Sequence, residues 1–182
     1  MAPQRRHIFV VMDPAGCGKS TVAKVLAESL GLPYVEGDDL HPSCNIQKMA
    51  AGIALTDQDR WDWLISVRRS TVNQLSDGAR GVVLSCSALK HKYRDVLRIA
   101  ALEDRTLCMH FLYLHADENV LLPRVGARQG HFMKAAMVRQ QLACLERPGG
   151  VEKDAVTVDG SQSVEKVAGE SLELVRAILS RF

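Results

Sequence analysis

The segment Val10–Thr21, VVMDPAGCGKST, restricts the possible folds of this chain more than any other part of the sequence. A buried strand pattern over residues 7–12 leads into it, and an amphipathic helix pattern over residues 20–32 follows. A strand, a glycine-rich turn and a helix in this order are typical of a phosphate-binding loop, whose consensus is G-x-x-x-x-G-K-[ST]. The end of the segment matches this consensus, but Asp13 occupies the position of the first glycine.

The other residues of the loop suit contact with a nucleotide. Backbone N–H groups of such a turn, and of the helix N-terminus after it, point at phosphates. Glycines allow the backbone to approach closely, Lys19 can reach the β- and γ-phosphates, and the Ser20 hydroxyl can ligate Mg²⁺. A chance glycine-rich turn is the alternative, which GCGKST between a strand and a helix disfavours. We therefore predict that ATP binds to Ala15, Gly16, Cys17, Gly18, Lys19, Ser20 and Thr21.

Asp13 is compatible with the loop backbone, because a residue before proline is pushed toward extended conformations that aspartate adopts. Its charge is the larger difficulty. A carboxylate ~7 Å from a phosphate charge costs about 2 kcal/mol at an effective dielectric near 20, which is roughly a 30-fold loss of affinity. The cost is small if the side chain points outward or pairs with a basic neighbour, and the sequence leaves its direction open.

Strand and helix patterns alternate along the chain, which favours a parallel sheet covered by helices on both faces. The expected strands are residues 7–12, 33–37, 81–87, 107–115 and 154–159. The expected helices are residues 20–32, 45–52, 56–75, 89–101, 118–130, 133–146 and 163–181, with Gly31 as a C-cap and Thr56 or Asp57 as a helix start.

The composition excludes several classes of protein. A length of 182 residues indicates a single domain, 1–182, and a net charge of +2 gives no reason to expect nucleic acid as a partner. No apolar run approaches the ~18–20 residues of a membrane span. The five cysteines are scattered without C-x-x-C spacing, which supports neither zinc nor a disulfide framework and makes the reducing cytoplasm the simplest compartment.

The second expected strand ends in VEGDDLHP, which places Glu36, Asp38, Asp39 and His41 near the phosphate loop. A kinase that phosphorylates a hydroxyl needs a carboxylate there to orient the alcohol and accept its proton. The alternative is that these residues only form a structural turn, since Gly, Asp and Pro are common in turns. For Asp39 we favour this alternative. Asp38 is the better candidate for the catalytic carboxylate.

The third expected strand ends in SCSALKHKYRD, with Ser87 at its carboxyl end. Lys90 and Arg94 are four residues apart and could share a helix face that grips a small anion, although a solvated basic face is the alternative. No acidic residue ends this strand, so Mg²⁺ would depend mainly on Ser20, the phosphates and water. Mobile ATPases usually carry that acid, and its absence favours a small-molecule kinase.

The segment RVGARQGHF places Arg124 and Arg128 about one helical turn apart, before a glycine-containing break. Two arginines in this position are typical of a lid, here about residues 124–135, that closes over ATP and stabilises the transferring phosphoryl group. The alternative is that the two arginines are ordinary surface residues. The phosphate loop in the same chain makes a lid role the better interpretation.

Four segments in this order resemble the gluconokinase family, P-loop small-molecule kinases related to shikimate kinase. The segments are GDDLHPSCNIQKMAAGIALTDQDRWDWL, CSALKHKYRD, ARQGHFM and QQLACLERPG, and the resemblance runs from His7 to about Asp159. It implies an α/β fold of the P-loop NTPase class. This is a three-layer sandwich with a five-stranded parallel sheet of order 2-3-1-4-5, helices on both faces and a lid.

The resemblance also implies the reaction, which is transfer of phosphate from ATP to D-gluconate to give 6-phosphogluconate, with Mg²⁺. It suggests a homodimer, and family members carry glycine in place of Asp13. Two alternatives stay open: a kinase for another small sugar acid, and a catalytically weakened nucleotide-binding relative. The implied site has Lys19, Asp38, Arg124 and Arg128 in catalysis and Asp38, His41, Ser87, Lys90, Arg94 and His131 in contact with the substrate.

Overall fold

A computed structural model describes residues 5–75, 78–127 and 131–181, with the side chains of residues 131–134 left out. Within these ranges the chain forms one parallel sheet of five strands in the order β2-β3-β1-β4-β5. This confirms the expected topology. The strands are β1 (Arg6–Met12), β2 (Tyr34–Glu36), β3 (Gly81–Ser85), β4 (Leu107–His115) and β5 (Ala155–Asp159).

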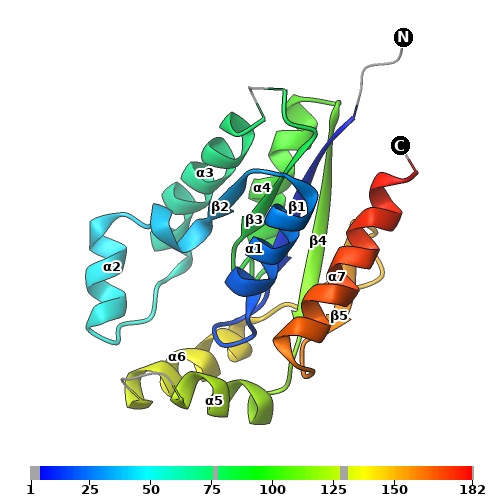
Figure 1. Cartoon of the computed structure of the whole chain (residues 1–182). Helices are drawn as coiled ribbons and strands as arrows, with labels where there is room; N and C mark the ends of the chain where they lie inside the picture. Colours follow the sequence, from blue (N-terminus) through cyan, green and yellow to red (C-terminus); the bar gives the residue numbers. More distant parts are fainter. Residues whose placement is uncertain (1–4, 76–77, 128–130, 182) are drawn as a thin grey trace.

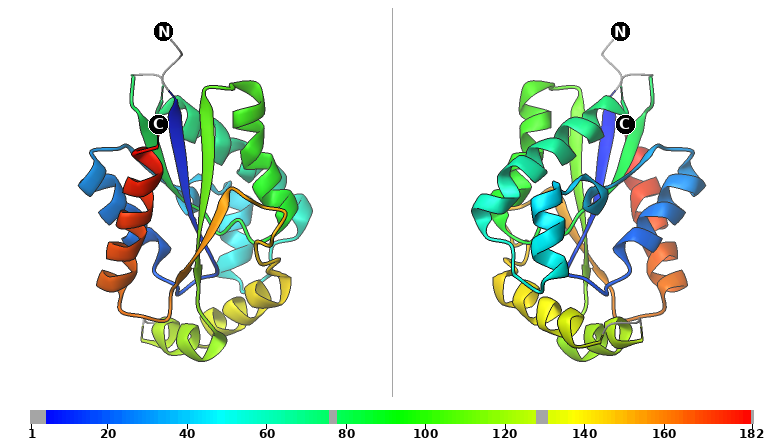
Figure 2. Two further views of the ribbon diagram at one scale, coloured as in Figure 1. Left: turned by 90° about the vertical axis from the view of Figure 1, so that its right-hand side faces the viewer. Right: turned by 90° about the vertical axis from the view of Figure 1, so that its left-hand side faces the viewer.

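The helices form a layer on each side of the sheet (Figures 1 and 2). One layer contains α1 (Lys19–Leu30) and α7 (Val164–Leu179), and the other contains α3 (Asp57–Asn73) and α4 (His91–Glu103). Figure 1 shows the short helix α2 (Ser43–Ala50) projecting beyond α3 at one side. The three-layer α/β fold expected from the sequence is therefore confirmed.

Strand β1 explains why two layers are needed. Its side chains alternate between the faces, so Ile8 and Val10 pack against α3 and α4, while Phe9 and Val11 pack against α1 and α7. All four side chains are at most 1% exposed. A strand buried on both faces in this way reads as a continuous apolar run, as the sequence does here.

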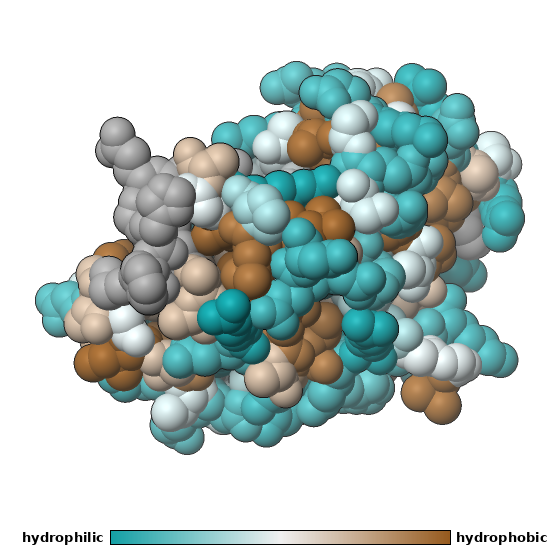
Figure 3. All heavy atoms as spheres, turned by 90° about the horizontal axis from the view of Figure 1, so that it is seen from below, coloured by the Kyte–Doolittle hydropathy of each residue, from teal (hydrophilic) through white to brown (hydrophobic). Residues whose placement is uncertain are grey.

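Helices α5 (Glu118–Gly126) and α6 (His131–Cys144) lie beyond the carboxyl ends of the strands, at the bottom of Figure 1. Seen from that end, the surface mixes hydrophilic and hydrophobic residues (Figure 3). Pro123 lies inside α5, so it does not end this helix. No helix in the described ranges is both long and apolar enough to cross a membrane.

Local signals set some of the helix ends. Thr56 and Asp59 form a reciprocal capping box at the start of α3. Gly31 closes α1 in the left-handed conformation, with φ of 63°, as expected. One element was not expected from the sequence: the residues after β2 form a 3-10 helix, η1 (Gly37–Leu40), which carries part of the candidate site.

Candidate active site

The phosphate loop joins β1 to α1 and has the backbone that its glycines allow. Gly16 and Gly18 have φ of 92° and 89°, in the left-handed region that side chains disfavour. Lys19 begins α1 and is only 8% exposed. Burial alone would lower the pKa of Lys19, but Cys17 and nearby carboxylates, including Asp38, more than offset this and raise it. The loop therefore holds its lysine charged at the N-terminus of a helix, where phosphates bind.

The Asp13 side chain points inward and has no hydrogen bond to a basic neighbour in the described part of the chain. It is 1% exposed, and both carboxylate oxygens lack a hydrogen-bond partner among the residues that the structure describes. Burial raises the pKa of Asp13 to about 8, although the charges of Lys19 and Arg147 lower it. The direction of this side chain, which the sequence left open, is inward.

Ser20 lies beside a cluster that sequence reasoning did not include in the metal site. Its hydroxyl is 3.3 Å from that of Ser85, and Tyr34 donates a 2.5 Å hydrogen bond to Oε2 of Glu36. The other oxygen of Glu36, Oε1, is buried and has no partner among the described residues. Burial would raise the pKa of Glu36, but interactions with Tyr34, Ser20 and Ser85 more than offset this and lower it.

The strand order explains why Glu36 reaches Ser20. Ser85 ends β3 without a carboxylate, but Glu36 pairs with it from the neighbouring strand β2. Glu36, an acidic residue on the neighbouring strand, therefore lies beside the end of β3, where no acidic residue was expected. An ionised carboxylate oxygen and a serine hydroxyl are hard oxygen donors of the kind that Mg²⁺ prefers. No cluster of three His, Cys, Asp or Glu side chains that could hold a metal occurs in the described part of the chain.

Helix η1 holds Asp38 beyond the end of β2. Gly37 fits closely there, since an added Cβ would lie 2.6 Å from the carbonyl oxygen of Ser85. Trp63 of α3 donates a buried 2.7 Å hydrogen bond to the carbonyl oxygen of Gly37. Asp38 and Asp39 are both exposed. Because the charge of Asp38 acts on Lys19, the predicted catalytic carboxylate and the phosphate lysine lie in one region.

His41 is fixed by stacking and by an amide. Its ring lies 4.1 Å from that of Trp63, nearly parallel, and its Nδ1 is 3.4 Å from Nδ2 of Asn45. Burial lowers the pKa of His41, which favours the neutral ring. The amide nitrogen of Asn45 only donates hydrogen bonds, so Nδ1 of His41 accepts and Nε2 carries the proton. His41 thus offers an N–H donor.

Lys90 lies at the start of α4, as its N-cap, and Ser87 lies before it, 7% exposed. Lys90 donates a 2.8 Å hydrogen bond to Asp57, at the first turn of α3. Lys92 and Tyr93 also bond to this carboxylate. Hydrogen bonds from Lys90 and these two residues hold the pKa of Asp57 well below its usual range. A ligand anion that binds Lys90 must share it with Asp57.

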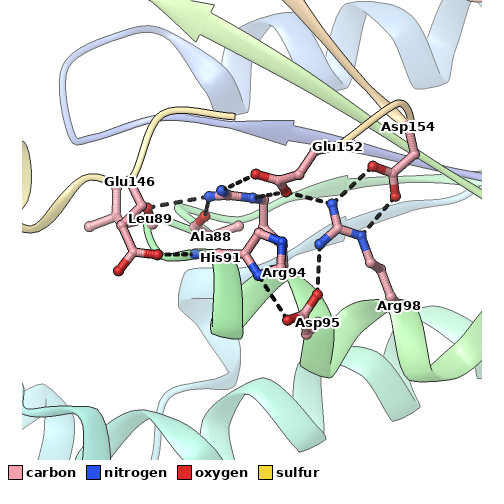
Figure 4. Close-up of polar contacts among 9 residues, drawn as sticks. All are labelled: Ala88, Leu89, His91, Arg94, Asp95, Arg98, Glu146, Glu152 and Asp154. Carbon is pink, nitrogen blue, oxygen red and sulfur yellow. Dashed lines mark hydrogen bonds and ion pairs between the residues drawn. The ribbon is translucent and has the colours of Figure 1, made fainter. Parts of the chain in front are cut away.

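Arg94 does not lie on an open helix face with Lys90, and this corrects the sequence reading. Its side chain is fully buried and pairs with Glu152 through hydrogen bonds of 2.6 and 2.7 Å (Figure 4). It also donates to the carbonyl oxygens of Ala88 and Leu89. A buried guanidinium needs such partners, because desolvation of an unpaired charge is costly. Arg94 therefore lies behind the loop that carries Ser87, not at its surface.

Arg124, in the last turn of α5, bonds to backbone. Its guanidinium donates to the carbonyl oxygens of Gly160, Ser161 and Gln162 at 2.7, 3.1 and 2.7 Å. It thereby joins α5 to the loop between β5 and α7. Arg128, the other predicted lid arginine, lies outside the described residues, as does the side chain of His131 at the start of α6.

Known proteins resemble this chain over nearly its whole length. The family model described as shikimate kinase matches residues 15–176. The probable gluconokinase of Schizosaccharomyces pombe is 45% identical over 176 residues, which cover 96% of this chain and 91% of that protein. The thermosensitive gluconokinase of Escherichia coli is 36% identical over 170 residues, which cover 93% and 88%. A solved structure of a gluconokinase from Sinorhizobium meliloti 1021 has a TM-score of 0.83 and 41% identity, and covers 97% of both chains.

Proposed function

This chain belongs to the gluconokinase family, and we propose that it transfers the γ-phosphoryl group of ATP to D-gluconate, giving ADP and 6-phospho-D-gluconate. One observation carries the proposal beyond the likeness to its relatives. The Ser20 hydroxyl at the start of α1 lies 3.3 Å from that of Ser85, which pairs with Glu36 two residues before Asp38, and the charge of Asp38 acts on Lys19. A phosphate-binding cation and a carboxylate for the acceptor hydroxyl therefore share one end of the sheet.

The nucleotide side of the reaction is electrostatic. Loop amides from Gly16 to Thr21 and the Lys19 ammonium hold the phosphates in line with the acceptor, whereas the Ala15 N–H donates to Gln141. This positioning supplies most of the catalysis in phosphoryl transfer. Ser20 and the Glu36 oxygen that has no partner among the described residues would hold Mg²⁺, which would supply positive charge to neutralise the phosphates.

The acceptor side combines a base with hydrogen-bond donors. Asp38 orients the 6-hydroxyl of gluconate and takes its proton as the new P–O bond forms. His41 donates from Nε2, while Ser87 and Lys90 bind hydroxyls or the carboxylate of the sugar acid. His131 contacts substrate or lid. Arg94 acts indirectly: its hydrogen bonds to the carbonyls of Ala88 and Leu89 position the loop that carries Ser87.

Lid closure completes the site in this proposal. Arg124 lies in the last turn of α5 and Arg128 follows this helix in the sequence, and closure would bring their positive charge to the transferring phosphoryl group. Arg124 must then exchange some of its backbone partners in the β5–α7 loop for phosphate oxygens. The lid is taken to span about residues 124–135.

Gluconate-dependent release of ADP from Mg·ATP tests the proposed function. We expect saturable turnover with D-gluconate, and ³¹P NMR of the product should show a phosphomonoester on carbon 6. A panel of other sugar acids and neutral sugars is the control. Preferential turnover with another sugar acid would show that this acid, and not gluconate, is the acceptor. Nucleotide binding without turnover on any acceptor would contradict the proposed kinase activity.

We also propose a cytoplasmic homodimer. All five cysteines carry free thiols in the structure, as a reducing compartment allows. The dimer rests on the resemblance to the family. Light scattering on a gel-filtration column measures the mass directly, and a mass near the 20.0 kDa of one chain would reject the dimer.

A further inference from the structure

Asp13 is the first residue after β1, and protein encloses its side chain. It is 1% exposed, and neither carboxylate oxygen has a partner among the residues that the structure describes. A buried ionised carboxylate without hydrogen bonds is costly, whereas the neutral acid avoids most of that cost. The geometry at the first position of the phosphate loop therefore favours protonated Asp13.

Among the residues that the structure describes, the groups that interact electrostatically with Asp13 include Lys19 on α1, Cys17 in the loop, Tyr113 on β4 and Arg147 after α6. Burial raises the pKa of Cys17 to about 11 and that of Tyr113 to about 12. The two cations stay charged over the same range, since the pKa of Lys19 is raised and arginine does not deprotonate. Of these five groups, Asp13 alone changes charge between pH 7 and 9.

We propose that Asp13 enters the nucleotide complex as a neutral carboxylic acid, so that binding of Mg·ATP above neutral pH takes up one proton from solvent at this residue. The proposal rests on the proposed function in one respect, that ATP binds to this loop. Phosphate charges next to the loop disfavour an ionised neighbour, so a bound nucleotide favours the protonated form further. Asp13 thereby occupies the first position of the loop, which is glycine in the consensus, without placing a negative charge there.

The sign and size of the effect follow from linkage. Below about pH 8 Asp13 is protonated in both the free protein and the complex, so the affinity does not depend on it. Above that pH, the complex binds one more proton than the free protein, and the affinity falls by up to about tenfold per pH unit. The fall stops at roughly 30-fold if the carboxylate lies ~7 Å from a phosphate charge at an effective dielectric near 20.

Isothermal titration calorimetry with Mg²⁺ and the non-hydrolysable analogue AMPPNP, without gluconate, measures this proton directly. Titrations at pH 7.0, 8.5 and 9.5, each in two buffers of different ionisation enthalpy, give the protons taken up on binding. For the wild-type chain we expect more uptake at pH 8.5 than at pH 7.0, with Kd rising from pH 8.5 to 9.5. For Asp13→Asn we expect neither effect. Asp39→Asn, at an exposed aspartate, is the matched control and should behave as the wild type.

The outcomes separate this proposal from the proposed function. Binding by the wild type without added proton uptake, or with the same uptake in Asp13→Asn, overturns the role of Asp13 and leaves the kinase intact. No binding by either protein at pH 7.0 overturns both. If Asp13→Asn does not fold, judged by circular dichroism, Asp13→Gly provides the same comparison and restores the loop consensus.

Discussion

The backbone N–H of Ala15 donates a 2.7 Å hydrogen bond to the side-chain oxygen of Gln141, which joins the phosphate loop to α6. The next residue of the loop, Gly16, packs against α5, where an added Cβ would lie 2.5 Å from Val125. Both helices that follow β4 therefore contact the phosphate loop. A change in either helix is expected to reach the nucleotide through these contacts.

Replacing Gln141 by alanine should detach α6 from the loop. The Ala15 N–H loses its partner, which lowers the free energy of unfolding by about 1 kcal/mol. We expect KM for ATP to rise more than KM for gluconate, because the affected loop holds the nucleotide. Urea unfolding and steady-state kinetics measure the two effects. Gln140→Ala is the matched control at an exposed position of the same helix, and equal effects of both variants would refute the contact's role.

Glu36→Gln should weaken the response to Mg²⁺. The amide keeps the shape of the side chain but removes the charge that complements the metal beside Ser20. Loss of a group that supports a metal site costs about 10–100-fold in metal affinity, so half-maximal activity should need at least about tenfold more Mg²⁺. Glu28→Gln, at an exposed position of α1, should leave the Mg²⁺ titration unchanged. An unchanged titration in Glu36→Gln would exclude Glu36 from the metal site.

Asp38→Asn should lower kcat by about 10²–10⁴-fold, the usual contribution of a positioned general base. Affinity for AMPPNP should change little, because the carboxylate acts on the acceptor. Asp39→Asn serves as the control, since Asp39 is the adjacent residue and is also exposed. Loss of activity in Asp39→Asn with an active Asp38→Asn would reverse the two assignments.

The sequence predicted the fold closely because its signals were local. Continuous apolar strands, the loop consensus and helix caps such as Gly31 depend on a few neighbouring residues, and the strand order followed from the family resemblance. Helix η1 was missed because its GDDL sequence also suits a turn. It forms where Trp63, 26 residues away, donates to the carbonyl of Gly37.

The site was predicted less completely, because its contacts join distant segments. The partner of Arg94 is Glu152, 58 residues away, and nothing near Arg94 in the sequence marks it as buried. Glu36 was recognised as a neighbour of the phosphate loop but not as a metal candidate. Its place next to Ser85 follows from the strand order, so this signal was present in the sequence reading.

Glu152→Gln should be strongly destabilising. It leaves the guanidinium of Arg94 fully buried without its anion, which costs about 3–5 kcal/mol. Replacing both Arg94 and Glu152 by Met should cost less than Glu152→Gln alone, because no unpaired charge remains inside. Glu118→Gln is the matched control, since it removes an exposed pair with Arg139 worth at most about 1 kcal/mol. Urea unfolding compares the three, and equal losses for Glu118→Gln and Glu152→Gln would contradict the argument.

Asp13→Asn should stabilise the folded chain increasingly as pH rises. The Asp13 carboxyl titrates near pH 8 in the folded chain and near its ordinary value of 3.8 when unfolded. Between these values the folded state keeps the Asp13 proton that the unfolded state loses, so the contribution of Asp13 to stability falls by about 1.4 kcal/mol per pH unit and then levels off above about pH 8. Asparagine does not titrate, so the stability of Asp13→Asn minus that of wild type should rise at this rate. Urea unfolding at pH 5, 6, 7 and 8 measures the difference, with Asp39→Asn, an exposed position in a chain that keeps Asp13, as the control that should follow the wild type. A constant difference for Asp13→Asn would mean that the buried carboxyl keeps an ordinary pKa, and would remove the basis for proton-coupled nucleotide binding.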